Sequence, residues 1–298
     1  MLAVTKVADY QNLCGECPQW NAEDGAVEWI DSVGGKLFRL AWATQQHSLM
    51  KQDLSVNGFR RNRRGGFLIT NNQGFWSWDG GEKLILIANQ VDGRECQLND
   101  CAADPRGRLL AGSWFYNPAA EYKLGALMCM DTSGKVTVLD EGFHLANGLG
   151  FDASGNTLYF TDSAVRRIYA YDYDLGTGTA RNRREFVRVP GDEGLPDGLA
   201  VDREGFVWSA QWYGGCIVRY DPDGKVERRV AIPAKQPSAL CFGGPDLTEI
   251  FVTSAGQSEP MPIMPPGYDA QTGYFGGALF HLNLGIAGQS PLVADIVV

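Results

Sequence analysis

Six polar residues recur along the chain at nearly regular intervals, and each precedes a short apolar run. They are Glu16, Asn57, Asn99, Asn147, Asp197 and Ser238, and successive members stand 41, 42, 48, 50 and 41 positions apart. If each run is the innermost strand of a repeated unit, these side chains gather around one axis. Carboxylate and amide oxygens are the ligands that hard divalent cations such as Ca²⁺ prefer. The alternative is that the Asn-Gly and Asp-Gly pairs in the series are ordinary turn dipeptides.

The apolar runs repeat at the same interval. They cover residues 26–31, 67–71, 109–113, 158–163, 207–212 and 250–255, and their starts are 41, 42, 49, 49 and 43 positions apart. Asp-x-x-Gly turns precede three of them, at 104–107, 152–155 and 202–205. In such a turn an Asp side chain caps the bend and Gly supplies a positive φ. A period of about 40–50 residues with roughly four short strands is typical of a β-propeller blade.

The six repeats predict an all-β fold, a six-bladed β-propeller with four-stranded blades and a central divalent metal site. Residues 1–298 are expected to form this propeller as a single domain. The run at 277–284 and an N-terminal strand are expected to share one blade, and residues 256–277 to form a long loop. A pair of β-sandwiches is the alternative, but it needs a linker near the middle of the chain. The stretches that contain Pro and Gly recur between repeats instead.

Composition narrows the class of protein further. The chain has 298 residues, and 26 Lys and Arg against 35 Asp and Glu give a net charge of −9. This balance argues against broad binding to nucleic acid or to anionic membranes. No apolar stretch of about 18 residues occurs, so no transmembrane helix is expected. The N-terminus does not have the pattern of a signal peptide. Seven irregularly spaced cysteines are consistent with free thiols in a reducing compartment. We therefore expect a soluble, cytoplasmic protein that is a monomer or a weak oligomer.

Motifs around the six positions resemble the regucalcin/gluconolactonase family of lactonases, also described as SMP-30/gluconolactonase/LRE-like. The matching stretches follow the family's order and lie at 13–20, 99–108, 147–163, 196–202, 242–247 and 252–255. The resemblance implies a six-bladed propeller that uses one divalent ion to hydrolyse a lactone. It implies Glu16, Asn147 and Asp197 as the metal ligands, and it places Asn99 where the family contacts the substrate and the water on the ion.

The hypothesis that follows is metal-assisted hydrolysis of a cyclic ester. The ion is expected to bind the lactone carbonyl oxygen and to stabilise the charge that develops there as water adds. Asp197 and Asn99 are the predicted catalytic residues. Asp197 orients or deprotonates the water, and the competing account is a metal-bound hydroxide that attacks without this base. Ca²⁺ is the first candidate for the ion, and Mg²⁺, Mn²⁺, Fe²⁺ and Zn²⁺ are alternatives because all accept oxygen ligands.

The predicted partner is a small-molecule lactone. Its predicted binding residues are Asn57, Gln97, Asn99, Trp114, Asn117 and His144. Sugar-lactone members of the family often carry Arg at the position of Gln97, and an acidic residue after the stretch that corresponds to 111–113. This sequence has neither the Arg nor the acidic residue. The resemblance therefore favours lactone hydrolysis as the reaction more strongly than it favours a sugar lactone as the substrate. The alternatives are a non-catalytic propeller that binds calcium or another ligand, and a promiscuous metal-dependent esterase or organophosphatase.

Overall fold

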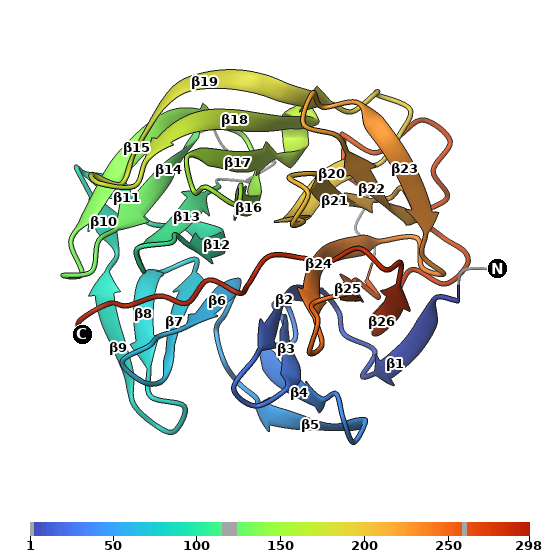
Figure 1. Ribbon diagram of the computed structural model, residues 1–298, viewed down its shortest axis with the longest axis horizontal. Coiled ribbons are helices and arrows are strands. Elements are labelled where there is room, and N and C mark those ends of the chain that lie inside the picture. Colours follow the sequence, from blue (N-terminus) through green and yellow to red (C-terminus); the bar gives the residue numbers. More distant parts are fainter. Residues whose placement is uncertain (1–2, 115–123, 258–260) are drawn as a thin grey trace. The chain divides into compact units, whose positions relative to one another are not determined.

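Six four-stranded sheets make up most of the structure, a computed structural model that describes residues 3–114, 124–257 and 261–298. This is the six-bladed β-propeller that the repeats predict, with four strands in every blade. Figure 1 shows how one blade is built, with β16, β17, β18 and β19 side by side in chain order. Within the three described ranges the only helix is one 3₁₀ turn, η1 (Ser163–Val165). No helix of the described chain is long and apolar enough to span a membrane.

The blades group into two compact units of three blades each. Unit 1 comprises Met1–Ser55 and Phe186–Pro291. Blade 1 consists of β2 (Gly15–Asn21), β3 (Ala26–Asp31), β4 (Lys36–Ala41) and β5 (Gln46–Lys51). Blade 5 consists of β20 (Leu195–Val201), β21 (Val207–Trp212), β22 (Cys216–Tyr220) and β23 (Val226–Ala231). Blade 6 consists of β24 (Pro237–Gly243), β25 (Glu249–Ser254), β26 (Ala278–Asn283) and β1 (Thr5–Asp9).

Unit 2 comprises Val56–Glu185 and Leu292–Val298. Blade 2 consists of β6 (Gly58–Arg61), β7 (Phe67–Asn71), β8 (Gly74–Trp78) and β9 (Leu84–Ala88). Blade 3 consists of β12 (Leu98–Ala103), β13 (Leu109–Ser113), β14 (Gly125–Met130) and β15 (Val136–Phe143), and a small hairpin of β10 (Gln90–Val91) and β11 (Arg94–Glu95) precedes it. Blade 4 consists of β16 (Ala146–Phe151), β17 (Thr157–Asp162), β18 (Arg167–Asp174) and β19 (Thr179–Arg188). A single domain over the whole chain stays a prediction.

Blade 6 combines strands from both ends of the sequence. β1 pairs antiparallel with β26, in a register that places Thr5 opposite His281 and Asp9 opposite Ala278. Figure 1 shows β1, in blue, beside β26, in dark red. The predicted shared blade is therefore confirmed. The described residues between β25 and β26 form no strand, as expected for the long loop at 256–277.

The Asp-x-x-Gly turns join the first and second strands of their blades as expected. The amide of Gly107 donates to the carbonyl of Asp104 at 3.0 Å, and the Asp104 carboxylate accepts the amides of Arg106 and Arg108 at 2.8 and 2.9 Å. The glycine has φ near +84°, in the left-handed region that only Gly enters at little cost. The same backbone bond closes the turn from Asp152 to Gly155 at 2.9 Å.

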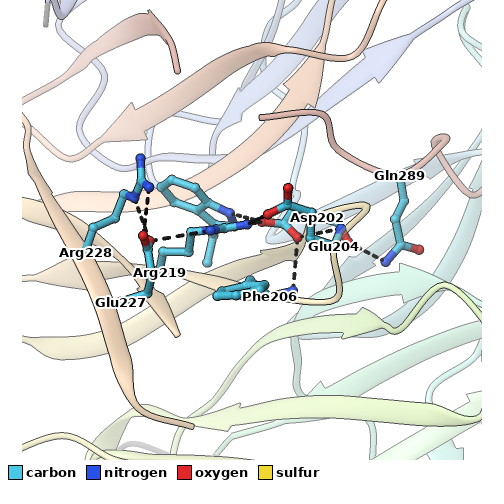
Figure 2. Close-up of polar contacts among 8 residues, drawn as sticks. Asp202, Glu204, Phe206, Arg219, Glu227, Arg228 and Gln289 are labelled. Carbon is cyan, nitrogen blue, oxygen red and sulfur yellow. Dashed lines mark hydrogen bonds and ion pairs between the residues drawn. The ribbon is translucent and has the colours of Figure 1, made fainter. Parts of the chain in front are cut away.

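In blade 5 this turn is secured by a buried arginine. Arg219 lies on β22, its side chain is only 4% exposed, and its Nε donates to Asp202 Oδ2 at 2.8 Å. Trp208 Nε1 donates to the same oxygen at 2.9 Å, and the guanidinium lies 3.7 Å from the centre of the Phe206 ring. Figure 2 shows this cluster, in which Gln289 also donates to the backbone oxygen of Asp202. Because the buried charge is paired and stacked, it fastens the turn and the segment that follows β26.

The apolar core lies between neighbouring blades of each unit. In unit 2, Leu110 and Leu127 of blade 3 pack with Phe160 and Tyr171 of blade 4. In unit 1, a second cluster joins blades 5 and 6 and includes Trp208, with 0% of its surface exposed. The second strands β3, β7 and β13 are buried along their whole length, as expected for runs that contact a blade on each side. This packing fixes the first strand of each blade and therefore the residues at its start.

Candidate functional site

The structure places all six predicted polar residues at the same point of their blades. Five of them lie within the first three residues of a strand: Glu16 in β2, Asn99 in β12, Asn147 in β16, Asp197 in β20 and Ser238 in β24. The sixth, Asn57, directly precedes β6. In unit 1 these residues are Glu16, Asp197 and Ser238; in unit 2 they are Asn57, Asn99 and Asn147. The spacing in the sequence therefore corresponds to one structural position repeated in every blade.

Five of the six first strands depart from regular pairing at this position. In blade 3, Leu98 lies opposite Ser113 and Cys101 opposite Ala111, so β12 advances three residues while β13 advances two. The same extra residue occurs after Ala146 in β16, after Pro196 in β20, after Pro237 in β24 and after Glu16 in β2. A β-bulge of this kind bends the strand and redirects its side chains. It explains how a residue inside a packed strand can turn away from the neighbouring blade.

Hydrogen bonds link three of the six positions to the next blade of their unit. In unit 2, Asn57 Nδ2 donates to the carbonyl of Leu98 at 2.8 Å, and Asn99 Nδ2 donates to the carbonyl of Ala146 at 2.8 Å. In unit 1, Ser238 Oγ donates to the carbonyl of Gly15 at 2.5 Å. In each case the acceptor is the residue just before the polar residue of the following blade. The pattern holds these residues in register and limits their rotation.

Two amide groups in unit 2 have a defined orientation. Asn99 Nδ2 donates to Asn147 Oδ1 at 2.9 Å as well as to Ala146. A backbone carbonyl only accepts hydrogen bonds, so it must face the Nδ2 end of Asn99. This uses both protons of that nitrogen, and Asn99 Oδ1 is left to accept a hydrogen bond from a ligand or water. Asn147 Oδ1 keeps a second lone pair for the same purpose.

Two carboxylates in unit 1, those of Glu16 and Asp197, both raise the pKa of the Cys14 thiol. Asp197 is buried, with 4% of its surface exposed, and Glu16 is half-buried. The pKa of the nearby Cys14 thiol is raised well above its usual value, first by burial, then by the charge of Glu16, with a further contribution from Asp197. Two negative groups that both influence one thiol make an electrostatic environment that a cation would relieve.

The donor types of these residues fit a hard divalent cation. The described residues contain no cluster of three or more His, Cys, Asp or Glu side chains arranged to hold a metal. Among the predicted residues, Glu16 and Asp197 in unit 1 offer carboxylate oxygens and Asn147 in unit 2 offers an amide oxygen, and such oxygen ligands suit Ca²⁺, Mg²⁺ or Mn²⁺ better than soft metals. The fixed Oδ1 of Asn147 supplies such an oxygen.

The residues predicted to bind substrate lie around blades 2 to 4 of unit 2. Gln97 directly precedes β12, and its carbonyl accepts the amide of Trp114 at 3.0 Å. Trp114 also forms an isolated β-bridge with Leu145. His144 is partly exposed, and Asn57 donates to Asn72 Oδ1 at 2.9 Å. Asn117 lies outside the described residues.

Two residues outside the predicted site, Asp162 and Ser163, contact the chain around Asn147. Asp162 ends β17 with 1% of its surface exposed, and its carboxylate accepts the amides of His144 and Leu145 at 2.9 and 3.0 Å. Ser163 Oγ accepts the Nδ2 of Asn147 at 2.9 Å. Blade 1 repeats the carboxylate contact, because Asp31 accepts the amides of Leu13 and Cys14. The signal in the sequence is an Asp-Ser pair that ends both second strands, at 31–32 and 162–163.

A cavity of about 660 Å³ opens in unit 2 beside blade 3. Its lining consists of Gln90, Gly93, Arg94, Glu95, Ser113, Leu124, Ala126, Glu141 and Gly142. Ser113 lies opposite Leu98 in the β12–β13 pairing, and Leu98 directly precedes Asn99. The ion pair between Arg94 and Glu141, at 2.5 Å, joins two sides of the lining. The volume falls within the range of small-ligand sites, about 300–1,000 Å³.

Together these features define a class, a six-bladed β-propeller with polar groups at the start of its innermost strands. Residues 14–256 match the family described as SMP-30/Gluconolactonase/LRE-like region. The chain therefore belongs to the SMP-30/gluconolactonase/LRE-like family, as the sequence motifs predict.

Known proteins resemble the chain over most of its length. The pentonolactonase XacC of Haloferax volcanii is 34% identical over 299 residues, which cover 99% of each chain. A 6-deoxy-6-sulfogluconolactonase of Pseudomonas putida is 31% identical and covers 83% of this chain and 85% of its own. Among solved structures, a calcium-binding protein, regucalcin, from Agrobacterium tumefaciens has a TM-score of 0.84 at 26% identity, covering 98% of this chain and 97% of that one.

Proposed function

We propose that this protein is an enzyme that hydrolyses a lactone to its hydroxy acid with the help of one divalent cation. The observation that carries the proposal is the Asn99–Asn147 pair, in which Asn99 Nδ2 donates to the carbonyl of Ala146 at 2.8 Å and to Asn147 Oδ1 at 2.9 Å. Asn99 Oδ1 and the second lone pair of Asn147 Oδ1 are then left for a ligand. Membership of a family that includes lactonases supports the reaction. Full-length similarity to a pentonolactonase supports it further.

The proposed cation ligands are Glu16, Asn147 and Asp197. Similarity to the calcium-binding regucalcin of Agrobacterium tumefaciens supports Ca²⁺ as the first candidate for the ion, with Mg²⁺, Mn²⁺, Fe²⁺ and Zn²⁺ as alternatives. A bound divalent cation supplies stabilisation of negative charge on a carbonyl oxygen. Its two carboxylate ligands would otherwise repel each other, so binding also stabilises the fold of this region.

The chain's own groups position the water and the substrate. We assign Asp197 to orient the attacking water and to accept its proton, because a buried carboxylate can hold a water molecule in one direction. Asn99 Oδ1 accepts a hydrogen bond from this water or from a substrate hydroxyl. Ala146, through its backbone oxygen, keeps the Asn99 amide in that orientation. These contacts lower the entropy that the reacting groups lose on reaching the transition state.

The substrate class we propose is a polar lactone of pentose or hexose size. Two of the relatives carry names of sugar lactonases. The groups that we propose around the substrate are Gln97, Trp114, His144, Asn57 and Asn117. Gln97 is a neutral residue, so we expect it to bind a hydroxyl group rather than an anionic substituent.

A cytoplasmic location is part of the proposal. None of the seven cysteines, all of which lie in the described ranges, forms a disulfide. Reduced cysteines in this number suit a reducing compartment.

A panel of lactones tests the proposal. Aldonolactones of five and six carbons and aliphatic lactones of equal ring size are offered to the protein, and acid release is followed with a pH indicator. We expect hydrolysis of the aldonolactones, and none in the variant Asp197→Asn. Binding of Ca²⁺ without hydrolysis of any lactone would favour a non-catalytic binding protein instead.

A further inference from the structure

We propose that Ser163 is a positioning residue that holds the Asn147 amide in the orientation needed to bind the cation. The inference rests on the proposed function, since it takes Asn147 Oδ1 as a ligand. It concerns a side chain in unit 2 that lies outside the predicted ligand and substrate sets.

The orientation of Asn147 is set from both ends of its amide group. Asn99 Nδ2 donates to Asn147 Oδ1 at 2.9 Å, and Asn147 Nδ2 donates to Ser163 Oγ at 2.9 Å. The carbonyl of Ala146 fixes the first amide, the first amide fixes the Oδ1 end of the second, and Ser163 holds the Nδ2 end. Without the hydroxyl the Asn147 side chain is held at one end only, and it can rotate about its last bond.

The local fold makes Ser163 a rigid support. It opens the 3₁₀ turn η1, is 2% exposed, and its amide donates to the carbonyl of Leu145 at 2.9 Å. The preceding residue, Asp162, accepts the amides of His144 and Leu145. The end of β17 is thus fastened to the two residues that lead into β16, and Asn147 follows them directly. A ligand orientation held by a buried hydrogen bond of this kind is typical of metal sites in proteins.

Blade 1 offers a matched residue without this contact. Ser32 follows Asp31 as Ser163 follows Asp162, and its amide donates to the carbonyl of Cys14 at 2.9 Å, as that of Ser163 does to Leu145. Its hydroxyl, however, donates to the same carbonyl of Cys14 at 3.4 Å. The two serines therefore share a backbone role, and only Ser163 contacts an Asn side chain of the predicted site.

Metal binding measured apart from catalysis tests this role. Five metal-free proteins are titrated with Mn²⁺: wild type, Ser163→Ala, Ser163→Thr, Ser163→Val and Ser32→Ala. Free Mn²⁺ is followed by electron paramagnetic resonance. We expect Mn²⁺ binding about tenfold weaker or more in Ser163→Ala and Ser163→Val, and close to wild type in Ser163→Thr and Ser32→Ala. Thr and Val have nearly the same shape, so their comparison isolates the hydroxyl even if the Ala variant does not fold.

The outcomes separate the inference from the function on which it rests. Equal Mn²⁺ affinity in Ser163→Val and Ser163→Thr overturns the positioning role while leaving lactone hydrolysis by the wild type intact. An equal loss in Ser32→Ala also overturns it, because removal of a hydroxyl that donates to the Cys14 carbonyl then has the same effect as removal of the one that contacts Asn147. A wild type that binds no Mn²⁺ and hydrolyses no lactone overturns both.

Discussion

Removal of the Asp162 carboxylate is expected to destabilise unit 2 strongly. The side chain is 1% exposed and accepts two backbone amides, from His144 at 2.9 Å and from Leu145 at 3.0 Å. In Asp162→Ala both amides lose their acceptor in a partly buried region. A fully buried polar group without a partner costs about 1–3 kcal/mol, and partial access to water lowers this, so the pair costs about 2–3 kcal/mol. This is a large part of a typical unfolding free energy of about 5–15 kcal/mol.

Urea denaturation followed by tryptophan fluorescence measures this loss. Asp172→Ala is the matched control, since Asp172 also lies in blade 4 but is exposed and pairs with Arg184 on the surface. It should unfold at the same urea concentration as wild type. Asp162→Asn keeps one acceptor oxygen and should fall between the two. If Asp162→Ala unfolds at the same midpoint as Asp172→Ala, the carboxylate does not fasten the chain before β16, and the reasoning is refuted.

Three further predictions concern the site, the substrate and the buried thiols. Asp197→Asn should lower lactone hydrolysis to the background rate, measured with a pH indicator, because it removes the proton acceptor; hydrolysis at the wild-type rate would exclude that role. Gln97→Ala should raise KM several-fold with little change in kcat, because Gln97 is proposed to bind a substrate hydroxyl away from the bond that breaks; Arg94→Ala, which changes the lining of the cavity beside blade 3 and removes an exposed ion pair with Glu141, serves as the control and should leave both constants unchanged. Burial raises the pKa of Cys96 to about 11 and of Cys129 to about 12, so at pH 8 both stay protonated and should resist iodoacetamide in the folded protein, and rapid labelling found by mass spectrometry would contradict this.

Much of the fold could be predicted from the sequence because the information is local and repeated. Each Asp-x-x-Gly turn is specified by residues a few positions apart, and the turn at 104–107 forms as expected. Six repeats with one polar residue each also predict that Glu16, Asn99 and Asp197 stand at equivalent strand positions. The period therefore carried both the blade number and the series of candidate residues.

The supporting contacts could not be predicted, because they join residues far apart in sequence through geometry. Asp31 and Asp162 end strands and accept amides of the chain before the first strand of the same blade. The sequence marks them only by the Asp-Ser pair that they share, and that pair does not reveal which amides they accept. The β-bulges at Asn99 and Asn147 are equally invisible, since they depend on how two strands pair. Ser163 became significant only when its hydroxyl proved to contact Asn147.

Removal and return of the metal tests cation-assisted lactone hydrolysis most directly. The protein is stripped with EDTA, dialysed, and assayed on an aldonolactone before and after addition of Ca²⁺, Mg²⁺, Mn²⁺ or Zn²⁺, with Asn147→Ala treated in parallel. We predict that hydrolysis by the wild type disappears with the metal and returns with at least one of these cations, and that Asn147→Ala needs a higher concentration of the same cation. Full hydrolysis by the metal-free wild type would contradict the proposed reaction.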